Sequence, residues 1–164
     1  MSPLRKGLIL GAAQLLIVSA LGGQLLLDRA RLPHVWVQTA PVDPSLPIRG
    51  RYVSLRLIVE FAPIRGEKED KWVSARLYVD NGRLAAVEDP RGHHWVAKPQ
   101  TGPERWILAE PVAYYIPEHA ADPSRLKAGE ELWVDCTIPK NGPPRPIRLG
   151  IKREGGEIEP IDAD

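Results

Sequence analysis

The amino-acid sequence predicts a mainly β protein: an N-terminal transmembrane helix followed by a compact antiparallel β sandwich or barrel domain with one short helix. Three observations predict this fold class. An uncharged apolar stretch of 20 residues, Leu8–Leu27, stands near the N-terminus. All but one of the 17 prolines follow Asp28, which disfavours long helices in the rest of the chain. Short runs in which apolar and polar residues alternate recur through that remainder.

The apolar stretch is long enough to cross a bilayer. At 1.5 Å per residue it spans about 30 Å, the thickness of the hydrocarbon core. It contains eight Leu, two Ile and one Val. These side chains favour insertion by about 3–7 kcal/mol before the Gln, Ser and Gly residues are subtracted. We therefore expect a retained membrane anchor; the alternatives are a signal peptide cleaved after Ala20 and a helix of a soluble protein.

The orientation of this anchor follows from the length of the segments on either side. Arg5 and Lys6 precede the apolar stretch and Arg29 and Arg31 follow it, so positive charge alone does not decide the topology. A long domain is translocated largely regardless of its charge, which favours a cytoplasmic N-terminus. The predicted location is the inner (cytoplasmic) membrane of a bacterium, with the C-terminal domain on the periplasmic or outer side.

The membrane segment also has spacings that suit helix–helix contact. Gly7 and Gly11 form a Gly-x-x-x-Gly pattern, and Ser19 and Gly23 form a second pair of small residues. Such spacings let two helices approach closely, and Gln14 could hydrogen-bond across the interface. Besides the lipid bilayer, an integral membrane protein is therefore a possible partner. The alternative is that these small residues reflect only their general frequency in membrane helices.

The chain is predicted to divide into four parts. These are a cytoplasmic stub with the transmembrane helix (1–27), a linker with the first strand (28–38), a β domain (39–153) and a flexible acidic tail (154–164). Arg29–Pro33 form the basic linker, and Val35–Thr39 the first strand. Trp36 is expected either at the membrane surface or in the core of that strand.

The β domain is predicted from period-two alternation. The longest run, Tyr52–Phe61, predicts a single half-buried strand, and Trp72–Val79 predicts a second. Asp80–Gly82 supplies the residues of a tight hairpin turn, so Arg83–Val87 should pair back on the second strand. The remaining predicted strands are His94–Ala97, Trp106–Glu110, Ala113–Ile116, Leu132–Ile138 and Ile147–Lys152.

The short helix is predicted at Asp122–Lys127. Asp122 could cap its N-terminus, Pro123 suits the first helical position and Gly129 could close its end. The Gly-rich acidic tail that begins at Glu154 is expected to be frayed.

Composition excludes several classes of protein. Lys+Arg is 22 and Asp+Glu is 21, a net charge of +1 that argues against nucleic-acid binding. A single cysteine, Cys136, excludes an intramolecular disulfide and a Cys-rich zinc site, and its strand pattern predicts a buried, inert thiol. The adjacent His93 and His94 would point to opposite faces of a strand, so they could not easily share a metal ion. Neither a metal nor another cofactor is predicted.

No catalytic set stands out, and an enzyme is not expected. There is neither a G-x-S-x-G nor an H-E-x-x-H motif. Pro44–Leu46 followed by Gly50 is similar to a pattern of type I signal peptidases, which also have an N-terminal anchor and an outer β domain. The position of their nucleophilic serine falls near Pro41, and no lysine in a matching strand could act as its base.

Residues 39–57 combine an Asp-Pro turn, a loop and an Arg-Gly pair that opens onto a long strand. This stretch resembles the bacterial GDYXXLXY protein family, whose motif falls on Gly50–Leu57. Gly50, Tyr52 and Leu55 match the motif. Alternation along the strand would place Tyr52 on one sheet face and Leu55 on the other.

The chain departs from that motif at two positions. Arg51 replaces the Asp and Leu57 replaces the final Tyr. Arg51 cannot do what a cation-binding or catalytic carboxylate would do, which favours a structural role for the motif. A second segment, Tyr114–Glu118, is similar to a family strand that ends in Pro-Glu. Together with the N-terminal membrane helix and a similar chain length, the resemblance covers most of the chain.

The resemblance implies a membrane-anchored protein of uncharacterised activity. Some members are encoded beside multi-helix membrane proteins, which suggests a complex. We therefore predict a single-pass envelope protein whose non-catalytic β domain interacts with an integral membrane partner. The alternative is an envelope module that binds a small ligand, glycan or lipid. Its possible binding surface comprises Arg49, Arg51, Tyr115 and Glu118 with Tyr52. The strand tryptophans could add a stacking surface, although sheet packing would also explain them.

Overall fold

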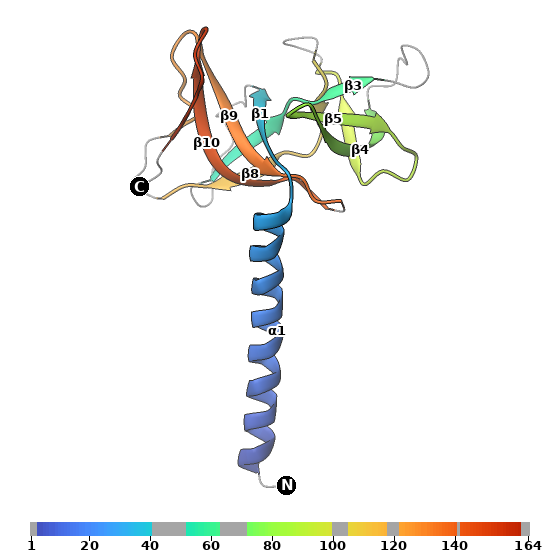
Figure 1. The fold of residues 1–164 in the computed structure, drawn as a ribbon, viewed down its shortest axis with the longest axis vertical. Coiled ribbons are helices and arrows are strands. Elements are labelled where there is room, and N and C mark those ends of the chain that lie inside the picture. The colour runs from blue at the N-terminus through green and yellow to red at the C-terminus, as the bar shows by residue number, and fades with distance from the viewer. Residues whose placement is uncertain are drawn as a thin grey trace. The chain divides into compact units, whose positions relative to one another are not determined.

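The structure is a computed structural model of the chain (Figure 1). It describes residues 3–40, 52–62, 72–99, 105–117, 122–140 and 142–161. The chain separates into two compact units, Met1–Leu32 and Pro33–Asp164, and each is described by itself. One apolar helix forms the first unit and antiparallel sheets dominate the second, which confirms the predicted mainly β fold class.

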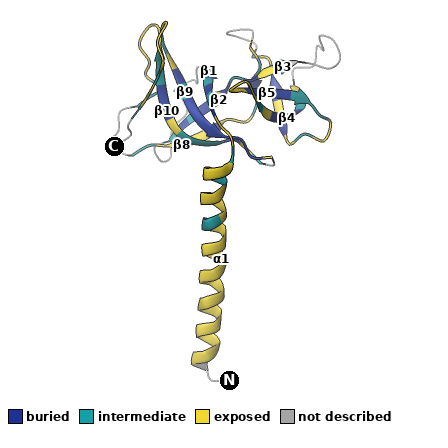
Figure 2. Cartoon of the chain, viewed as in Figure 1, coloured by how far each residue is buried: buried dark blue, intermediate teal, exposed yellow. Residues whose placement is uncertain are grey.

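The first unit is the helix α1, Pro3–Arg31. Its residues Leu4–Arg31 are long and apolar enough to cross a membrane, a property that a signal sequence shares. Its large apolar side chains are exposed, from 51% at Leu27 to 76% at Leu4, so no protein core covers them (Figure 2). Because α1 continues through Arg31, the linker predicted at Arg29–Pro33 shrinks to two residues before β1.

The second unit consists of two sheets. The strand order is β11-β10-β9-β1-β2-β8 in the first sheet and β3-β5-β4-β6-β7 in the second. The strands of the first sheet are β1 (His34–Ala40), β2 (Tyr52–Leu57), β8 (Val112–Tyr115), β9 (Glu130–Thr137), β10 (Arg145–Arg153) and β11 (Ile158–Pro160). Those of the second are β3 (Glu60–Ala62), β4 (Trp72–Asp80), β5 (Arg83–Glu88), β6 (His94–Ala97) and β7 (Ile107–Leu108).

The core of this unit comes from the alternating apolar positions that the sequence marks. Val35 and Val37 of β1 and Leu55 and Leu57 of β2 are buried, while the residues between them are not. Apolar side chains from both sheets join them in one cluster, so the two sheets share a single hydrophobic core.

The single strand predicted at Tyr52–Phe61 is wrong, because the chain leaves the first sheet after Leu57. Ile58 forms a bridge with Ile107 of β7, and the Val59 N–H donates to the Trp106 carbonyl (2.9 Å). The chain then pairs in parallel with β5 as β3. The segment 58–62 therefore bonds β7 at its start and β5 at its end, which curls the second sheet on itself; we call this curled sheet the small barrel. Val59 is buried like Leu57, so the alternation runs unbroken through the change of sheet.

The predicted hairpin is confirmed. Asn81 and Gly82 adopt positive φ angles of 46° and 74°, and Asp80 pairs with Arg83 across the turn. A two-residue turn with both central residues at positive φ matches the twist of the paired strands. It places β5 against β4 in the predicted register.

Two other local predictions are wrong. The helix expected at Asp122–Lys127 is a turn, in which the Asp122 carboxylate accepts hydrogen bonds from the backbone N–H (3.0 Å) and the hydroxyl (2.6 Å) of Ser124. Asp and Pro start turns as readily as helices, and too few residues follow to propagate a helix. In the tail predicted to fray from Glu154, Ile158–Pro160 instead pair with β10 as β11, and residues 162–164 lie outside the described residues.

Candidate functional site: an aromatic groove in the β domain

The structure brings two of the predicted site residues together. Tyr52 of β2 lies opposite Tyr115 of β8, with the ring centroids 6.1 Å apart. Leu55 is fully buried on the opposite face, as alternation predicted. The two segments that carried the family resemblance are thus neighbouring antiparallel strands.

The other predicted site residues are not placed. Gly50, Arg49, Arg51 and Glu118 lie outside the residues that the structure describes. Tyr115 is 78% exposed on the edge strand β8, and neither tyrosine lines either of the two cavities described below. The Tyr52–Tyr115 pair is therefore a surface feature of the described chain.

A larger feature is a cavity of about 610 Å³, which we call the aromatic groove. One wall comes from β1 and β9, and the other from β3, β5 and the segment before β7. Its aromatic side chains are Trp36, Phe61, Trp106 and Trp133. Its polar side chains are Gln38, Glu60, Arg83 and Arg105. Such a mixture of aromatic surface and a few polar groups is typical of small-ligand sites.

Strand register explains the first wall. Val35 and Val37 turn toward the core, so Trp36 and Gln38 lie on the other face of β1. Gln38 pairs with Trp133 of β9, which brings both tryptophans to the same face of neighbouring strands.

Gly150 of β10 makes room for one of these rings. A Cβ atom there would lie 3.0 Å from Cζ3 of Trp36 and 2.7 Å from Cγ2 of Ile158. Any larger residue would force the indole ring or β11 to move. The bare backbone at Gly150 therefore lets Trp36 lie close to the sheet.

The second wall is held by an aromatic pair. The rings of Phe61 and Trp106 meet edge to face with their centroids 4.6 Å apart. Both side chains pack on the hydrophobic core, and the Trp106 carbonyl accepts the Val59 N–H. Such pairs add about 0.5–1.5 kcal/mol to the burial of the rings. This wall is therefore fixed by the same segment that closes the small barrel.

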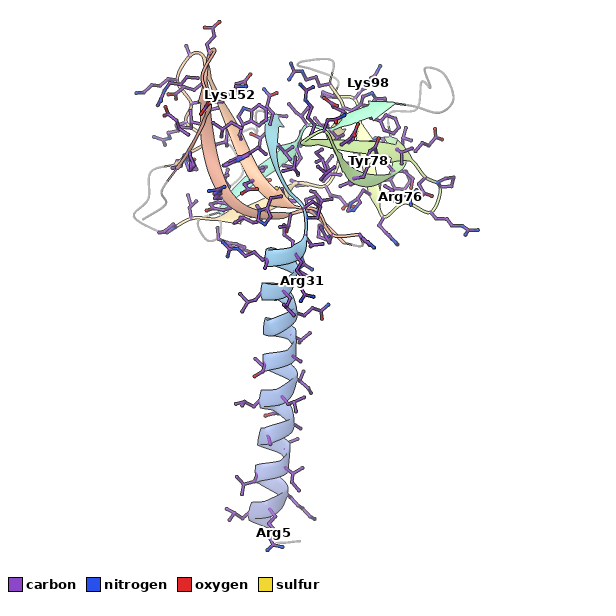
Figure 3. All side chains as sticks on the ribbon, in the orientation of Figure 1. Arg5, Arg31, Arg76, Tyr78, Lys98 and Lys152 are labelled. Carbon is purple, nitrogen blue, oxygen red and sulfur yellow. The ribbon has the colours of Figure 1, made fainter. Side chains whose placement is uncertain are left out.

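Each tryptophan of the groove has a cation over its ring. Arg148 lies 5.2 Å from the ring of Trp36, and Lys152 lies 5.2 Å from that of Trp133. The Lys98 ammonium lies 5.5 Å from the ring of Trp106. Lys152 belongs to β10 and Lys98 directly follows β6 in the chain; both are labelled in Figure 3. These cation–π contacts orient the rings and add positive charge around them.

The polar groups of the groove are paired with one another, Arg105 with Gln38 across the two walls and Arg83 with Glu60 within the second wall. Arg105 donates to Oε1 of Gln38 (2.6 Å), and Arg83 donates to Oε1 of Glu60 (2.6 Å). The contact with Glu60 raises the pKa of the Arg83 guanidinium. A guanidinium has five N–H donors, so Arg105 keeps donors for a ligand after it binds Gln38.

A second cavity, of about 510 Å³, adjoins this contact. It shares Gln38, Ile58 and Arg105 with the aromatic groove and extends toward Leu126 and Glu130. The Glu130 carboxylate accepts a hydrogen bond from the Lys127 N–H (3.1 Å), which lowers the pKa of that carboxyl. The Arg105–Gln38 contact thus stands between two hollows of comparable size.

The titratable residues singled out in the sequence do not converge on the groove. Cys136 is fully buried, and burial with the nearby Asp135 raises the pKa of its thiol to about 12, which confirms the inert thiol. His94 is buried in β6, and burial lowers its pKa, whereas its neighbour His93 is exposed. Within the described ranges, no group of three His, Cys, Asp or Glu residues could hold a metal ion.

Comparison of the chain with family models, curated proteins and solved structures finds no match. The resemblance to the GDYXXLXY family therefore stays a prediction. It concerns Tyr52 and Leu55, whose places in β2 are described, and Gly50, whose place is not.

Sequence reasoning identified the strand tryptophans but not the groove. Trp36, Trp106 and Trp133 line the groove, whereas Trp72 and Trp95 do not. Arg105 and Gln38 are separated by 67 positions in the chain and meet only in the folded unit. The available signal was alternation, which places Trp36 and Gln38 on the face of β1 opposite Val35 and Val37.

Proposed function

We propose that this chain is a single-pass membrane protein whose β domain is an envelope binding module for a glycan. The aromatic groove is the observation that carries the proposal. Four half-buried aromatic side chains line one hollow together with an amide, a carboxylate and two guanidinium groups.

A sugar suits this lining because its ring is amphipathic. The C–H faces of a sugar can lie on the indole rings of Trp36 and Trp133, while its hydroxyl groups can pair with Gln38 and Arg105. A volume of about 610 Å³ falls within the usual range for small-ligand sites and accommodates a disaccharide. A lipid chain would offer no acceptor to the N–H donors that Arg105 keeps after it binds Gln38, whereas sugar hydroxyl groups would.

Ligand titration of the full-length protein in lipid nanodiscs tests this proposal. The probes are cellobiose, N,N′-diacetylchitobiose and, as a lipid control, dodecanoate, each followed by intrinsic tryptophan fluorescence. We expect saturable binding of at least one disaccharide. Arg105→Met keeps the length of the side chain but removes its donors, and should weaken that binding by about tenfold, or about 1.4 kcal/mol.

Trp72→Phe is the matched control, because Trp72 is exposed and lies outside the groove. Its affinity should equal that of the unmodified chain. The glycan assignment fails if dodecanoate alone binds, or if neither disaccharide binds at about 10 mM, where even weak sites fill.

The membrane part of the proposal rests on α1. Its length and its exposed apolar side chains support an anchor. We propose a cytoplasmic N-terminus, with the β domain on the periplasmic side of the inner membrane. Fusion of alkaline phosphatase after Asp164 should give an active enzyme in a bacterial host. Activity of a cytoplasmic reporter at the same site would show the opposite topology.

A second candidate function is interaction with an integral membrane protein through α1. The side of the helix that carries Gly7, Gly11 and Gln14 is exposed, and a Cβ atom at either glycine would meet no described atom within 4 Å. The family resemblance supports the same idea. Crosslinking in native membranes should recover a specific integral protein, and Gly7→Leu with Gly11→Leu should abolish its recovery. Recovery that is insensitive to both changes would count against this interface.

A further inference from the structure

The exposed apolar side chains of the β unit gather on one face of the small barrel. Outside α1, five large apolar residues of the described chain are exposed, and three of them lie on β4 and β6. They are Trp72 (57% exposed), Tyr78 (45%) and Trp95 (47%). Such clustering on a protein surface marks an interaction site more often than scattered exposure does.

Strand register brings these side chains to the same face. Val73, Ala75 and Leu77 turn toward the core, so the alternate residues of β4 face outward. Ser74 pairs with Trp95, which makes Trp72 and Trp95 diagonal neighbours. Arg76 and Tyr78 continue the same face, and Figure 3 shows both on β4. We call Trp72, Arg76, Tyr78 and Trp95 the outer patch.

Polar contacts hold β4, the strand that carries most of the outer patch, in place. The Ser74 hydroxyl shares its one proton between the carbonyls of Asp89 (2.9 Å) and Gly92 (3.3 Å). Nε of Arg76 lies 3.6 Å from the Asp89 carboxylate, although the Arg76 side chain is 67% exposed. The aromatic rings therefore project from a regular sheet that fixes their spacing.

We infer that the outer patch binds the surface of the lipid bilayer. This inference rests on the proposed role of α1 as a membrane anchor. Trp and Tyr are enriched at membrane interfaces because their rings are apolar and carry one polar group, and Arg pairs with lipid phosphate.

Chain connectivity keeps the lipid within reach. α1 ends at Arg31 and β1 begins at His34, so only Leu32 and Pro33 separate them. Two residues span at most about 7 Å. If α1 is anchored, every part of the β unit therefore lies within about one diameter of the β unit from the lipid headgroups. At that distance an exposed aromatic patch meets lipid at a high effective concentration.

Quenching of tryptophan fluorescence by lipid provides the test, because α1 contains no tryptophan and all five lie in the β unit. Full-length protein is reconstituted in vesicles of phosphatidylcholine and phosphatidylglycerol (3:1), with or without lipid brominated near the headgroup. We expect quenching in the unmodified chain. Arg76→Glu with Tyr78→Ser leaves every tryptophan in place and should reduce the quenched fraction at least twofold.

Two further measurements make the result decisive. Tyr115→Ser with Arg125→Glu changes two exposed residues outside the patch and should leave the quenching unchanged. Co-flotation with the vesicles reports on α1 separately. Failure to float would refute the proposed anchor, whereas flotation without quenching would overturn the outer patch alone. In the latter case, concentration-dependent dimers in analytical ultracentrifugation would assign the patch to a second copy of the chain.

Discussion

Asp135 is a buried carboxylate on the first sheet that contacts side chains of both neighbouring strands. Its side chain is only 5% exposed, and its carboxylate accepts a hydrogen bond from Nε of Arg148 (3.0 Å). His34 approaches its other oxygen at 3.5 Å. Arg148 also lies over the ring of Trp36. Asp135, which lies outside the groove, therefore helps to orient Trp36, which lines it, through Arg148.

We expect Arg148→Gln to lower the free energy of unfolding by about 1–3 kcal/mol, because it leaves the Asp135 carboxylate buried without its cation. The measurement is urea unfolding followed by tryptophan fluorescence. Adding Asp135→Asn should recover part of the loss, since no buried charge would remain. Arg76→Gln is the control: its side chain is 67% exposed, and the loss of its ion pair with Asp89 should cost less than about 0.5 kcal/mol.

His94 should make stability depend on pH. Burial lowers its pKa in the folded state, whereas in the unfolded chain it titrates near 6.5. Between these two pKa values the unfolded state binds more protons, so the unfolding free energy falls as the pH drops below about 6.5. The slope for one proton is at most about 1.4 kcal/mol per pH unit. His94→Asn should flatten this dependence between pH 7.5 and 5.5 in urea unfolding.

The control for this titration is the neighbouring, exposed His93. His93→Asn should keep the pH dependence of the unmodified chain. An unchanged slope in His94→Asn would show that titration of His94 is not the origin of the pH dependence.

At the scale of elements, close backbone packing joins the strands of the small barrel. Gly92 lies between β5 and β6, and a Cβ atom there would stand 2.3 Å from the carbonyl oxygen of Ala75. Ala75 is fully buried in β4. The loop can therefore close over β4 only if position 92 has no side chain.

Gly92→Ala should lower the free energy of unfolding by more than about 2 kcal/mol, because β4 or the loop must move to remove the clash. Thermal unfolding followed by circular dichroism measures this change. Gly156→Ala is the matched control, since its Cβ atom would make only a 3.4 Å contact with the Arg153 carbonyl. Similar melting temperatures for the two variants would contradict the packing argument.

At the scale of the whole molecule, the two units of the chain suit different surroundings, the helix lipid and the β unit water. α1 exposes large apolar side chains along its length, whereas the β unit buries its apolar residues in a core of its own (Figure 2). An exposed apolar helix of this length is stable in lipid and costly in water.

Alkaline carbonate extraction should therefore leave the full-length protein in the membrane pellet. A chain that begins at Pro33 should appear in the supernatant, because it retains the hydrophobic core and loses the apolar helix. Full-length protein in the supernatant would mean that α1 is removed by cleavage or does not insert.

Local sequence determined the elements of this protein. The uncharged run Leu8–Leu27 predicted α1, and alternation together with the hairpin turn predicted β4, β5 and β6 nearly to the residue. The positive φ angles of Asn81 and Gly82 followed from residue type alone. These features depend on near neighbours in the chain, so a short window contains the information that specifies them.

Only the tertiary structure decided what depends on distant neighbours. The change of sheet at Ile58, the pairing of β11 and the meeting of Arg105 with Gln38 all rest on contacts with remote segments. Alternation records which residues are buried but not which sheet buries them. The aromatic groove and the outer patch therefore emerge only when strand register sets side chains from separate strands on a common face.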